Sequence, residues 1–449
     1  MNSPLPPSIG ELDQRHCWHP FTPLDRWLEP DRAPLVLTGG EGALLRDAEG
    51  REYLDGNSSI WTNLHGHRHP RLDAALRAQL DLVAHTSFLG FTHPAAVSLA
   101  AALAALWPAG TLERVFFSDN GSTAMEVALK IAVQFWQQTG KPNRTRFVTF
   151  DGAYHGDTMG ASSLGGISLF HERFAAWQFP VEHVGSVEEL VDLEAGEIAA
   201  VVIEPLIQGA AGMRIWPAGM LRQVREWCDA HGALLIADEV MTGFGRTGTM
   251  FASEREGVVP DLVCLAKGLT GGYMPLAATM VARSVFDAFI GGPERTLYYG
   301  HSYTGNALGC ALALENLAIF REERVLERLQ GQIDCLEGVL AERLSALPWV
   351  WEIRQCGFIA GIELRDAGGA PFPPAALTGA RVCEAARAHG LLTRPIRDVL
   401  VLMLPYCVSG EQIARAVDAL RFGIEEVCAE RGDASSPLRN EEAEHQILR

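Results

Sequence analysis

The chain lacks long apolar runs, paired cysteines and an excess of basic residues. No run approaches the ~18 uninterrupted apolar residues of a membrane-spanning helix, and the N-terminus lacks the basic and apolar regions of a signal peptide. The nine cysteines form no Cys-x-x-Cys pair, which indicates reduced thiols rather than a disulfide framework or a zinc site. These absences predict a cytoplasmic protein with no membrane association and no bound metal.

The charge balance argues against a nucleic-acid partner. Acidic residues outnumber basic ones by 55 to 37, which gives a net charge of −18. A surface that binds the phosphates of a nucleic acid needs clustered lysine and arginine instead.

The composition and the patterns that are present predict a globular protein with two domains. Its 449 residues are 48% apolar and 20% charged, which is ordinary for such proteins. Residues 61–325 alternate short apolar runs with helical patterns, which predicts a large α/β domain. Residues 326–429 predict a smaller α+β domain, to which we expect residues 1–60 to contribute. The polar residues 430–449 are expected to form a flexible tail.

Three short apolar runs in the large domain are expected to be parallel strands. They are residues 199–203, 233–237 and 262–266, and a helical pattern follows the first. The second run leads directly into Asp238 and the third into Lys267. Ligands of parallel sheets bind beyond the carboxyl ends of the strands. We therefore expect Asp238 and Lys267 to face one crevice.

An aspartate and a lysine in one crevice suit pyridoxal phosphate chemistry. A lysine can form a Schiff base with this cofactor, and a carboxylate can keep the pyridine nitrogen protonated so that the ring accepts electrons. The alternative is a buried Asp238–Lys267 ion pair without a catalytic role.

Two turns add candidate cofactor contacts. Gly121 and Ser122 lie in a polar turn before the helical pattern 124–138, where free N–H groups and the helix dipole favour a phosphate. The turn could equally be an ordinary helix cap. Tyr154, in the turn after the strand predicted at 146–150, could stack on a flat ring or simply pack against its neighbours.

One motif supports a different class of protein. The segment Gly243-Phe-Gly-Arg-Thr-Gly248 has the G-x-G-x-x-G spacing of dinucleotide-binding oxidoreductases. That motif must open a helix, and an acidic residue must end the next strand. No helical pattern follows Gly248, and Asp261 begins the next strand rather than ending it. An NAD-binding oxidoreductase is therefore the less favoured alternative.

The run Leu234-Leu-Ile-Ala-Asp-Glu-Val-Met-Thr-Gly-Phe-Gly-Arg-Thr-Gly248, followed by Lys267-Gly, resembles the class III aminotransferases. The resemblance extends over residues 11–425. It implies the fold-type I architecture of pyridoxal phosphate enzymes, an α/β fold in which a mostly parallel seven-stranded sheet forms a large domain beside a smaller α+β domain. It also implies a homodimer with shared active sites.

Five stretches are similar to the biotin-pathway branch of this family. They are His16-Cys-Trp-His-Pro-Phe-Thr22, Ser58-Ser-Ile-Trp61, Tyr154-His-Gly-Asp-Thr158, Gln208-Gly-Ala-Ala-Gly-Met213 and Arg394-Pro395. This similarity implies conversion of 8-amino-7-oxononanoate to 7,8-diaminononanoate. A broader alternative within the family is an aminotransferase of ω-amino acids or diamines, and a protein that binds the cofactor for regulation is a remote one.

The resemblance assigns the cofactor contacts. Lys267 is expected to bind pyridoxal phosphate covalently and to move the proton at the substrate carbon. Asp238 is expected to hold the pyridine nitrogen, and Tyr154 to lie against the ring. Gly121 and Ser122 are expected to bind the phosphate.

The resemblance also assigns substrate contacts and contacts across the dimer. Gly300, His301 and Ser302 are expected to reach the phosphate and the substrate of the partner subunit. Arg394 is expected to bind the carboxylate of the keto acid, a task that suits the planar guanidinium. The alternative for Arg394 is a surface ion pair.

Four further residues are expected to shape the substrate pocket: Asp157, Trp61, Phe21 and Ile60. Family members that use S-adenosylmethionine usually carry Tyr in place of Phe21 and Trp in place of Ile60. The residues of this chain are similar to those of members that use lysine. S-adenosylmethionine and lysine therefore both remain candidate amino donors.

Overall fold

The computed structural model describes residues 8–29 and 34–432. Its centre is a seven-stranded sheet with the strand order β4-β12-β11-β10-β7-β5-β6. The strands are β4 (Leu112–Ser118), β12 (Ala277–Ala282), β11 (Leu262–Leu265), β10 (Leu234–Asp238), β7 (Ile198–Ile203), β5 (Arg146–Phe150) and β6 (Val181–Val184). Within it, β12 runs antiparallel to its two neighbours, and the other pairs are parallel. The predicted mostly parallel seven-stranded sheet is therefore confirmed.

Helices cover both faces of this sheet, which explains why its central strands are apolar throughout. Every residue of β7, β10 and β11 is buried. Alternate side chains pack in opposite directions: Ile236 belongs to the core beneath α6 (Gly121–Gln138), and Leu235 to the core beneath α9 (Met220–His231). Strands buried on both faces lose the polar alternation of half-exposed strands.

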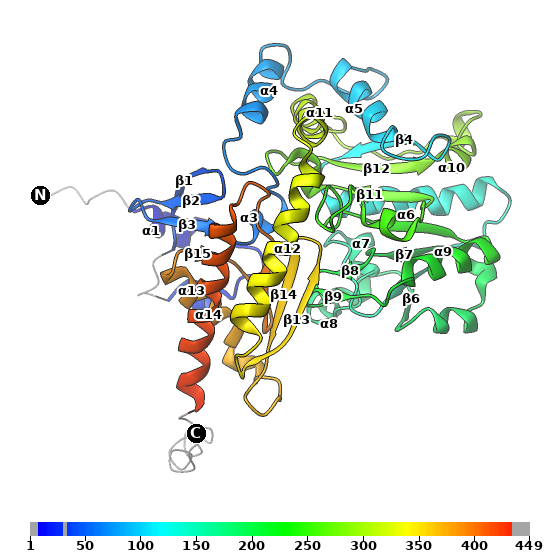
Figure 1. Cartoon of the computed structure of the whole chain (residues 1–449). Coiled ribbons are helices and arrows are strands. Elements are labelled where there is room, and N and C mark those ends of the chain that lie inside the picture. Colours follow the sequence, from blue (N-terminus) through cyan, green and yellow to red (C-terminus); the bar gives the residue numbers. More distant parts are fainter. Residues whose placement is uncertain (1–7, 30–33, 433–449) are drawn as a thin grey trace, which may run out of the picture.

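Two further sheets form a second unit, which we call the C-terminal unit (Figure 1). The first sheet has the order β1-β2-β3-β15, with β1 (Leu37–Glu41), β2 (Leu44–Asp47), β3 (Glu52–Asp55) and β15 (Leu391–Leu392). The second has the order β13-β14-β17-β16, with β13 (Val350–Cys356), β14 (Ile359–Leu364), β17 (Val399–Leu402) and β16 (Pro395–Ile396). Because β3 pairs with β15, the N-terminal strands join the C-terminal half of the chain.

Helices and short turns complete both units. The remaining α-helices are α1 (Ile9–His16), α2 (Leu24–Trp27), α3 (Ser58–Trp61), α4 (Pro70–Leu80), α5 (Pro94–Ala104), α7 (Met159–Ser163), α8 (Ser168–His171), α10 (Arg283–Asp287), α11 (Ala307–Glu322), α12 (Val325–Leu344), α13 (Thr378–Ala388) and α14 (Gly410–Gly432). The 3-10 turns are η1 (Glu172–Trp177), η2 (Glu188–Asp192), η3 (Ala195–Glu197), η4 (Ala252–Glu256), η5 (Lys267–Thr270), η6 (Pro293–Arg295) and η7 (Pro374–Ala376). A two-stranded ribbon pairs β8 (Ile207–Gln208) with β9 (Arg214–Ile215).

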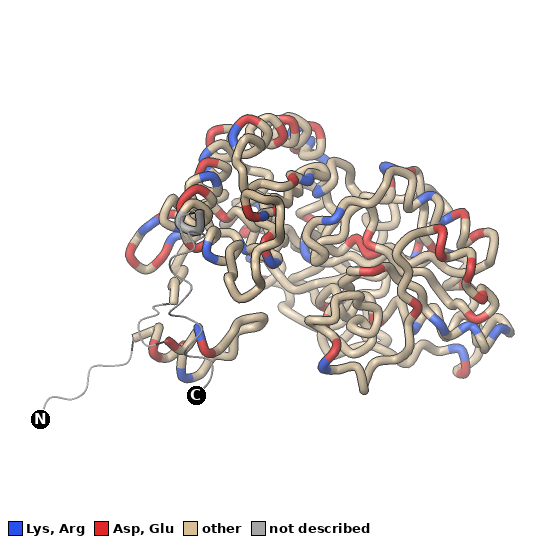
Figure 2. Tube along the Cα trace, turned by 90° about the horizontal axis from the view of Figure 1, so that it is seen from below, with Lys and Arg blue, Asp and Glu red and all other residues tan. Residues whose placement is uncertain are grey.

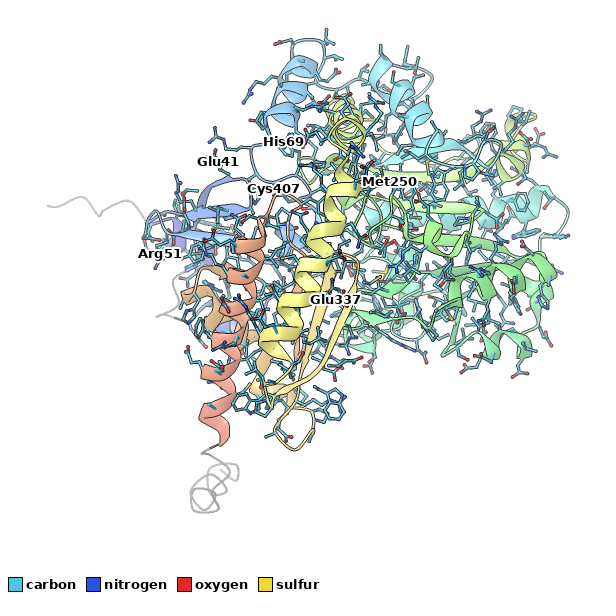
Figure 3. The ribbon with its side chains drawn as sticks, in the orientation of Figure 1. Glu41, Arg51, His69, Met250, Glu337 and Cys407 are labelled. Carbon is cyan, nitrogen blue, oxygen red and sulfur yellow. The ribbon has the colours of Figure 1, made fainter. Side chains whose placement is uncertain are left out.

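One apolar core runs through both units. It includes Phe244 and Leu269 beside the seven-stranded sheet and Leu336 and Ile362 in α12 and β14. Met250, labelled in Figure 3, packs against this core near α12. The two units are therefore held together by buried apolar surface as well as by polar contacts.

The G-x-G-x-x-G segment joins the two units and opens no helix. Residues 243–248 form successive turns. The buried Arg246 donates to the carbonyls of Leu404, at 2.8 Å, and Asn63, at 3.1 Å. The dinucleotide-binding alternative therefore lacks its structural context.

Figure 2 shows acidic and basic residues interspersed along the chain. Helices with the length and apolarity of a membrane span are absent from the described residues. Helix α14 continues to Gly432, and the rest of the predicted flexible tail, residues 433–449, lies outside the described residues.

Candidate active site

A cleft of about 2070 Å³ lies where the carboxyl ends of the central strands meet the C-terminal unit. Asp238 ends β10, Lys267 directly follows β11 and its neighbour Ala266, and both residues line the cleft. The sequence-based expectation that they face one crevice is confirmed. Trp61 and Arg394 line the same cleft from distant parts of the chain.

The environment of Lys267 makes its amine easier to deprotonate than that of an ordinary lysine. Its Nζ lies 4.6 Å from the centre of the Trp61 ring. Burial lowers the pKa of Lys267 to about 8, although the nearby carboxylates of Asp238 and Glu204 act to raise it. A neutral amine is the form that attacks a carbonyl and accepts a proton. Its backbone φ of 42° is unusual for a residue with a side chain, and such strain often accompanies functional sites.

Asp238 is held by a histidine that the sequence reasoning did not single out. Its Oδ2 lies 2.7 Å from Nδ1 of His155, and its Oδ1 accepts from the N–H of Val240 at 3.1 Å. His155 is buried, and its Nε2 lies 3.3 Å from Oγ1 of Thr149. The only signal for His155 in the sequence is its place next to Tyr154. Its contact fixes the orientation of a carboxylate that could bind a protonated ring nitrogen.

A second buried acid, Glu204, was also missed as a site residue. Its Oε2 accepts from the N–H of Tyr154 at 3.3 Å, and its Oε1 from the N–H of Gly209 at 2.9 Å. Burial raises the pKa of Glu204 to about 7, and the neighbouring Asp238 acts in the same direction. Glu204 therefore ties together two turns that line the cleft. Its position after the buried strand β7 was the available sequence signal.

The start of α6 forms a seat for an anion. The helix begins at Gly121, three residues before the sequence pattern indicated, so Gly121 and Ser122 lie in its first turn. Asn120 caps it by accepting from the N–H of Thr123 at 3.0 Å. The first N–H groups of an 18-residue helix and its dipole attract a phosphate.

Two glycines leave the space for this seat. A Cβ on Gly121 would lie 2.8 Å from Cγ1 of Val240, and one on Gly156 would lie 2.8 Å from Cα of Ser122. Gly156 also has a φ of 123°, which residues with side chains rarely adopt. The close approach of the turn to the helix thus depends on the lack of side chains.

Tyr154 and Asp157 lie next to this seat. The hydroxyl of Tyr154 donates to Oδ2 of Asp157 at 2.7 Å, and the N–H of Asp157 donates to Oγ of Ser122 at 3.1 Å. Burial and the Asp157 carboxylate raise the pKa of Tyr154, so its phenol stays protonated. The ring of Tyr154 packs edge-on against Phe170, 6.0 Å between centres.

The mouth of the cleft combines apolar side chains with one arginine. Phe21 and Ile60 are 55% and 47% exposed, so both are available to a ligand. Arg394 donates to the carbonyl of Phe21 at 3.2 Å. In the described part of the chain, no carboxylate pairs with Arg394, so the alternative role in a surface ion pair is not seen. Ile60 and Trp61 lie in a left-handed turn, with φ values of 65° and 67°.

The structure does not bring Gly300, His301 and Ser302 to this cleft. The carbonyl of Ser302 lies 2.8 Å from Nε2 of His85, and the N–H of His301 donates to Oγ1 of Thr304 at 3.1 Å. Gly300 and Ser302 are exposed. Their expected contacts with the phosphate and substrate in the site of a partner subunit stay a prediction.

The residues of the cleft fit pyridoxal phosphate. A lysine with a lowered pKa, a fixed carboxylate at the end of the adjacent strand and an anion seat at a helix start match the three groups that this cofactor presents. Within the described chain, no cluster of three His, Cys, Asp or Glu side chains could hold a metal ion. Together with the seven-stranded sheet, the site defines a fold-type I pyridoxal phosphate enzyme.

Comparison with known proteins identifies the family of this pyridoxal phosphate enzyme. The family described as aminotransferase class-III matches residues 28–423, and the chain belongs to this family of pyridoxal phosphate-dependent aminotransferases. It is 46% identical to the adenosylmethionine-8-amino-7-oxononanoate aminotransferase of Geobacter sulfurreducens, over 94% of this chain and 98% of that protein. It is 47% identical to the protein of the same name from Nitratidesulfovibrio vulgaris, over 93% and 81% of the two chains.

A solved structure agrees with this comparison. The crystal structure of adenosylmethionine-8-amino-7-oxononanoate aminotransferase from Methanocaldococcus jannaschii matches with a TM-score of 0.91 at 37% identity. The match covers 93% of this chain and 99% of that one. The fold-type I architecture and the aminotransferase class predicted from the sequence are confirmed.

Proposed function

We propose that this enzyme converts 8-amino-7-oxononanoate to 7,8-diaminononanoate, the biotin-pathway reaction, with S-adenosylmethionine or lysine as amino donor. One observation carries the proposal: the cleft that holds Asp238 and Lys267 also contains Arg394, without a carboxylate partner among the described residues. A keto acid with its carboxylate far from its carbonyl needs a cation at that distance from the reacting lysine. The names of the relatives in the comparison support this substrate.

Each of several side chains in the cleft has a separate role in the reaction. Pyridoxal phosphate, when bound, supplies an electron sink for the carbanion next to the transferred nitrogen. Lys267 binds the cofactor and moves the proton at the reacting carbon. Asp238, oriented by His155, holds the pyridine nitrogen in its protonated form. The first N–H groups of α6, at Gly121 and Ser122, bind the phosphate.

The walls of the cleft bind and orient the substrate. Tyr154 would lie against the cofactor ring, and its hydrogen bond to Asp157 fixes the phenol. Trp61, Phe21 and Ile60 provide apolar surface for the methylene chain of the keto acid. Arg394 binds the carboxylate through charge-assisted hydrogen bonds.

The assembly and the domain division are part of the proposal. We infer a cytoplasmic homodimer in which Gly300, His301 and Ser302 of each chain reach the other chain's site. The exposure of Gly300 and Ser302 in one chain supports this arrangement. We also propose a large domain of residues 61–325 and a small domain of residues 326–429, the latter completed by residues 1–60 through the β3–β15 pairing.

The two half-reactions test the proposal directly. The protein loaded with pyridoxal phosphate is mixed separately with S-adenosylmethionine, lysine and a simple ω-amino acid, and absorbance reports formation of pyridoxamine phosphate. The amine-loaded protein then receives 8-amino-7-oxononanoate, and mass spectrometry detects the product. We expect one of the first two donors to react and 7,8-diaminononanoate to form. Reaction with the ω-amino acid alone, without turnover of the keto acid, would identify an aminotransferase of ω-amino acids or diamines instead.

The role of Arg394 has its own test. Arg394→Gln is expected to raise the KM for 8-amino-7-oxononanoate by about ten-fold or more, because a charge-assisted contact is lost. The absorbance of the lysine-bound cofactor should not change. Arg415→Gln, at an exposed position on α14, is the matched control and should leave the KM unchanged.

A further inference from the structure

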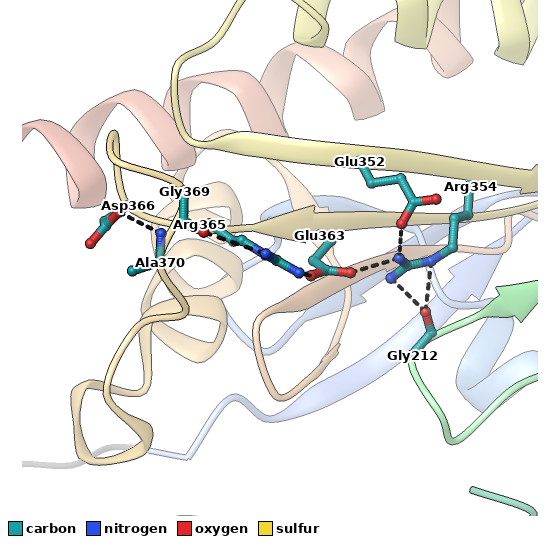
Figure 4. A network of polar contacts seen from close by, with 8 residues as sticks. All are labelled: Gly212, Glu352, Arg354, Glu363, Arg365, Asp366, Gly369 and Ala370. Carbon is teal, nitrogen blue, oxygen red and sulfur yellow. Dashed lines mark hydrogen bonds and ion pairs between the residues drawn. The ribbon is translucent and has the colours of Figure 1, made fainter. Parts of the chain in front are cut away.

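Arg354, on β13 of the C-terminal unit, uses its whole guanidinium to join three segments of the chain. Its Nε and Nη2 donate to the carbonyl of Gly212 at 3.2 and 2.9 Å, and its Nη1 contacts Oε2 of Glu363 at 2.6 Å and the carboxylate of Glu352 (Figure 4). The side chain of Arg354 is only 13% exposed. Glu363 in turn pairs with Arg365 at 2.9 Å.

The carbonyl that Arg354 holds belongs to a wall of the cleft. Ala210, Ala211 and Gly212 line the cavity between β8 and β9. At the other end of this wall, Gly209 lies so close to Trp61 that an added Cβ would be 3.2 Å from Cζ3 of the indole. The segment from Gly209 to Gly212 therefore connects Arg354 with Trp61, whose ring lies over the Lys267 amine.

The backbone of this wall needs outside support. Met213 follows Gly212 and has a φ of 56°, a left-handed conformation that costs energy for a residue with a side chain. Such conformations persist when the surroundings hold them in place. The paired hydrogen bonds from Arg354 to Gly212 supply that support, together with the apolar cluster in which Met213 is buried.

Arg354 also links the two ends of the substrate site. Arg394 directly precedes β16, which belongs to the same four-stranded sheet as β13. Lys267 and Gly212 belong to segments that extend from the seven-stranded sheet. The contact between Arg354 and Gly212 therefore joins the unit that carries Arg394 to a segment of the unit that carries Lys267, and all four residues line the same cleft.

We propose that Arg354 is a positioning residue that makes the enzyme selective for the length of the keto acid. By holding the Gly212 wall to the C-terminal unit, it fixes the separation between Arg394 and Lys267. The inference rests on the proposed carboxylate-binding role of Arg394. A misplacement of about 1 Å at a reacting centre can lower a rate by orders of magnitude, so a fixed separation discriminates between chains that differ by one methylene.

The test compares substrate length profiles. The holoenzyme, Arg354→Gln and Arg354→Lys are each assayed for kcat/KM with 8-amino-7-oxononanoate and with homologues one methylene shorter and longer. We expect the preference for the nine-carbon acid to fall at least five-fold in both variants, mainly through kcat because the reacting carbon is misplaced, while cofactor absorbance is retained. Arg354→Lys keeps a positive charge between the two glutamates and covers the case in which Arg354→Gln does not fold.

Arg365→Gln is the matched control for this test. It removes an arginine from the same cluster, including its contact with Glu363, but leaves the Gly212 carbonyl bound. Its length profile should equal that of the unmodified enzyme. An unchanged profile in the Arg354 variants, or an equal change in Arg365→Gln, would overturn the proposal.

The same measurements separate this inference from the proposed function. If Arg394→Gln leaves kcat/KM for the keto acid unchanged, the carboxylate site itself is wrong. If Arg394→Gln loses activity while the Arg354 variants keep the normal length profile, only the role of Arg354 is refuted.

Discussion

At the scale of single residues, the site is governed by burial and by a few fixed carboxylates. Lys267 lies in a setting where burial lowers its pKa while Asp238 and Glu204 oppose the shift. The outcome is an amine whose pKa is about 8. Asp238 is kept in place by His155, so the direction of its carboxylate in the cleft is fixed by a buried hydrogen-bond partner.

The lowered pKa of Lys267 predicts how the protein without cofactor captures pyridoxal phosphate. Only the neutral amine attacks the aldehyde, and its fraction rises as pH rises through the pKa. The capture rate should therefore reach half its maximum near pH 8 rather than near the ordinary lysine value. Stopped-flow absorbance between pH 6 and 11 measures this midpoint.

Asp238→Asn provides the control for this prediction. It removes a carboxylate that acts to raise the pKa of Lys267, so the midpoint should move to lower pH. A midpoint above pH 10 in the unmodified protein, or a shift to higher pH in Asp238→Asn, would contradict the assigned environment.

At the scale of elements, the anion seat at the start of α6 depends on how closely the turn at Gly156 approaches that helix. The sequence pattern placed the helix at residues 124–138, because its apolar periodicity begins there. The observed helix starts at Gly121 because Asn120 caps it through Thr123. The turn at Gly156 then packs against Ser122 in a conformation that excludes a side chain.

Gly156→Ala is expected to weaken cofactor binding at least ten-fold, because the new methyl group would push the turn away from Ser122. The dissociation constant of pyridoxal phosphate measures the effect. Gly140→Ala is the matched control: Gly140 also has a positive φ, 80°, but no atom lies within 4 Å of the position of its added Cβ. It should lose about 1 kcal/mol of stability through backbone strain and keep normal affinity. Equal losses of affinity in both variants would mean that strain, not crowding, is responsible.

At the scale of the whole molecule, the cleft lies at the junction between the two units. One apolar core extends through both units, β3 pairs with β15, and Arg246 hydrogen-bonds across the interface to Leu404. The cleft therefore forms only when distant parts of the chain have assembled. The segment around Gly300, exposed in one chain, is proposed to complete the site of a second copy.

A hybrid dimer tests whether sites are shared. One chain carries Lys267→Ala, and the other carries His301→Ala with Ser302→Ala; each homodimer should be inactive or strongly impaired. If these residues serve the partner's site, the hybrid contains one intact site, and purified hybrids should show about half of the normal activity. Two affinity tags isolate the hybrid, and turnover of the keto acid measures it. No recovery in the hybrid would mean that His301 and Ser302 serve the site of their own chain.

The amino-acid sequence alone determines the central sheet and the positions of Asp238 and Lys267 at the ends of its strands. Buried strands, helical crossovers and the polar residue at each strand end are short-range patterns, so the crevice with Asp238 and Lys267 could be predicted. The contact between His155 and Asp238 joins residues 83 positions apart, and that between Arg354 and Gly212 joins residues 142 apart. The first pair meets through packing within the seven-stranded unit and the second through packing between the two units, because no local periodicity encodes which distant side chains meet. The tertiary structure therefore decides how the carboxylate is oriented, where the cleft wall is held and how far Arg394 lies from Lys267.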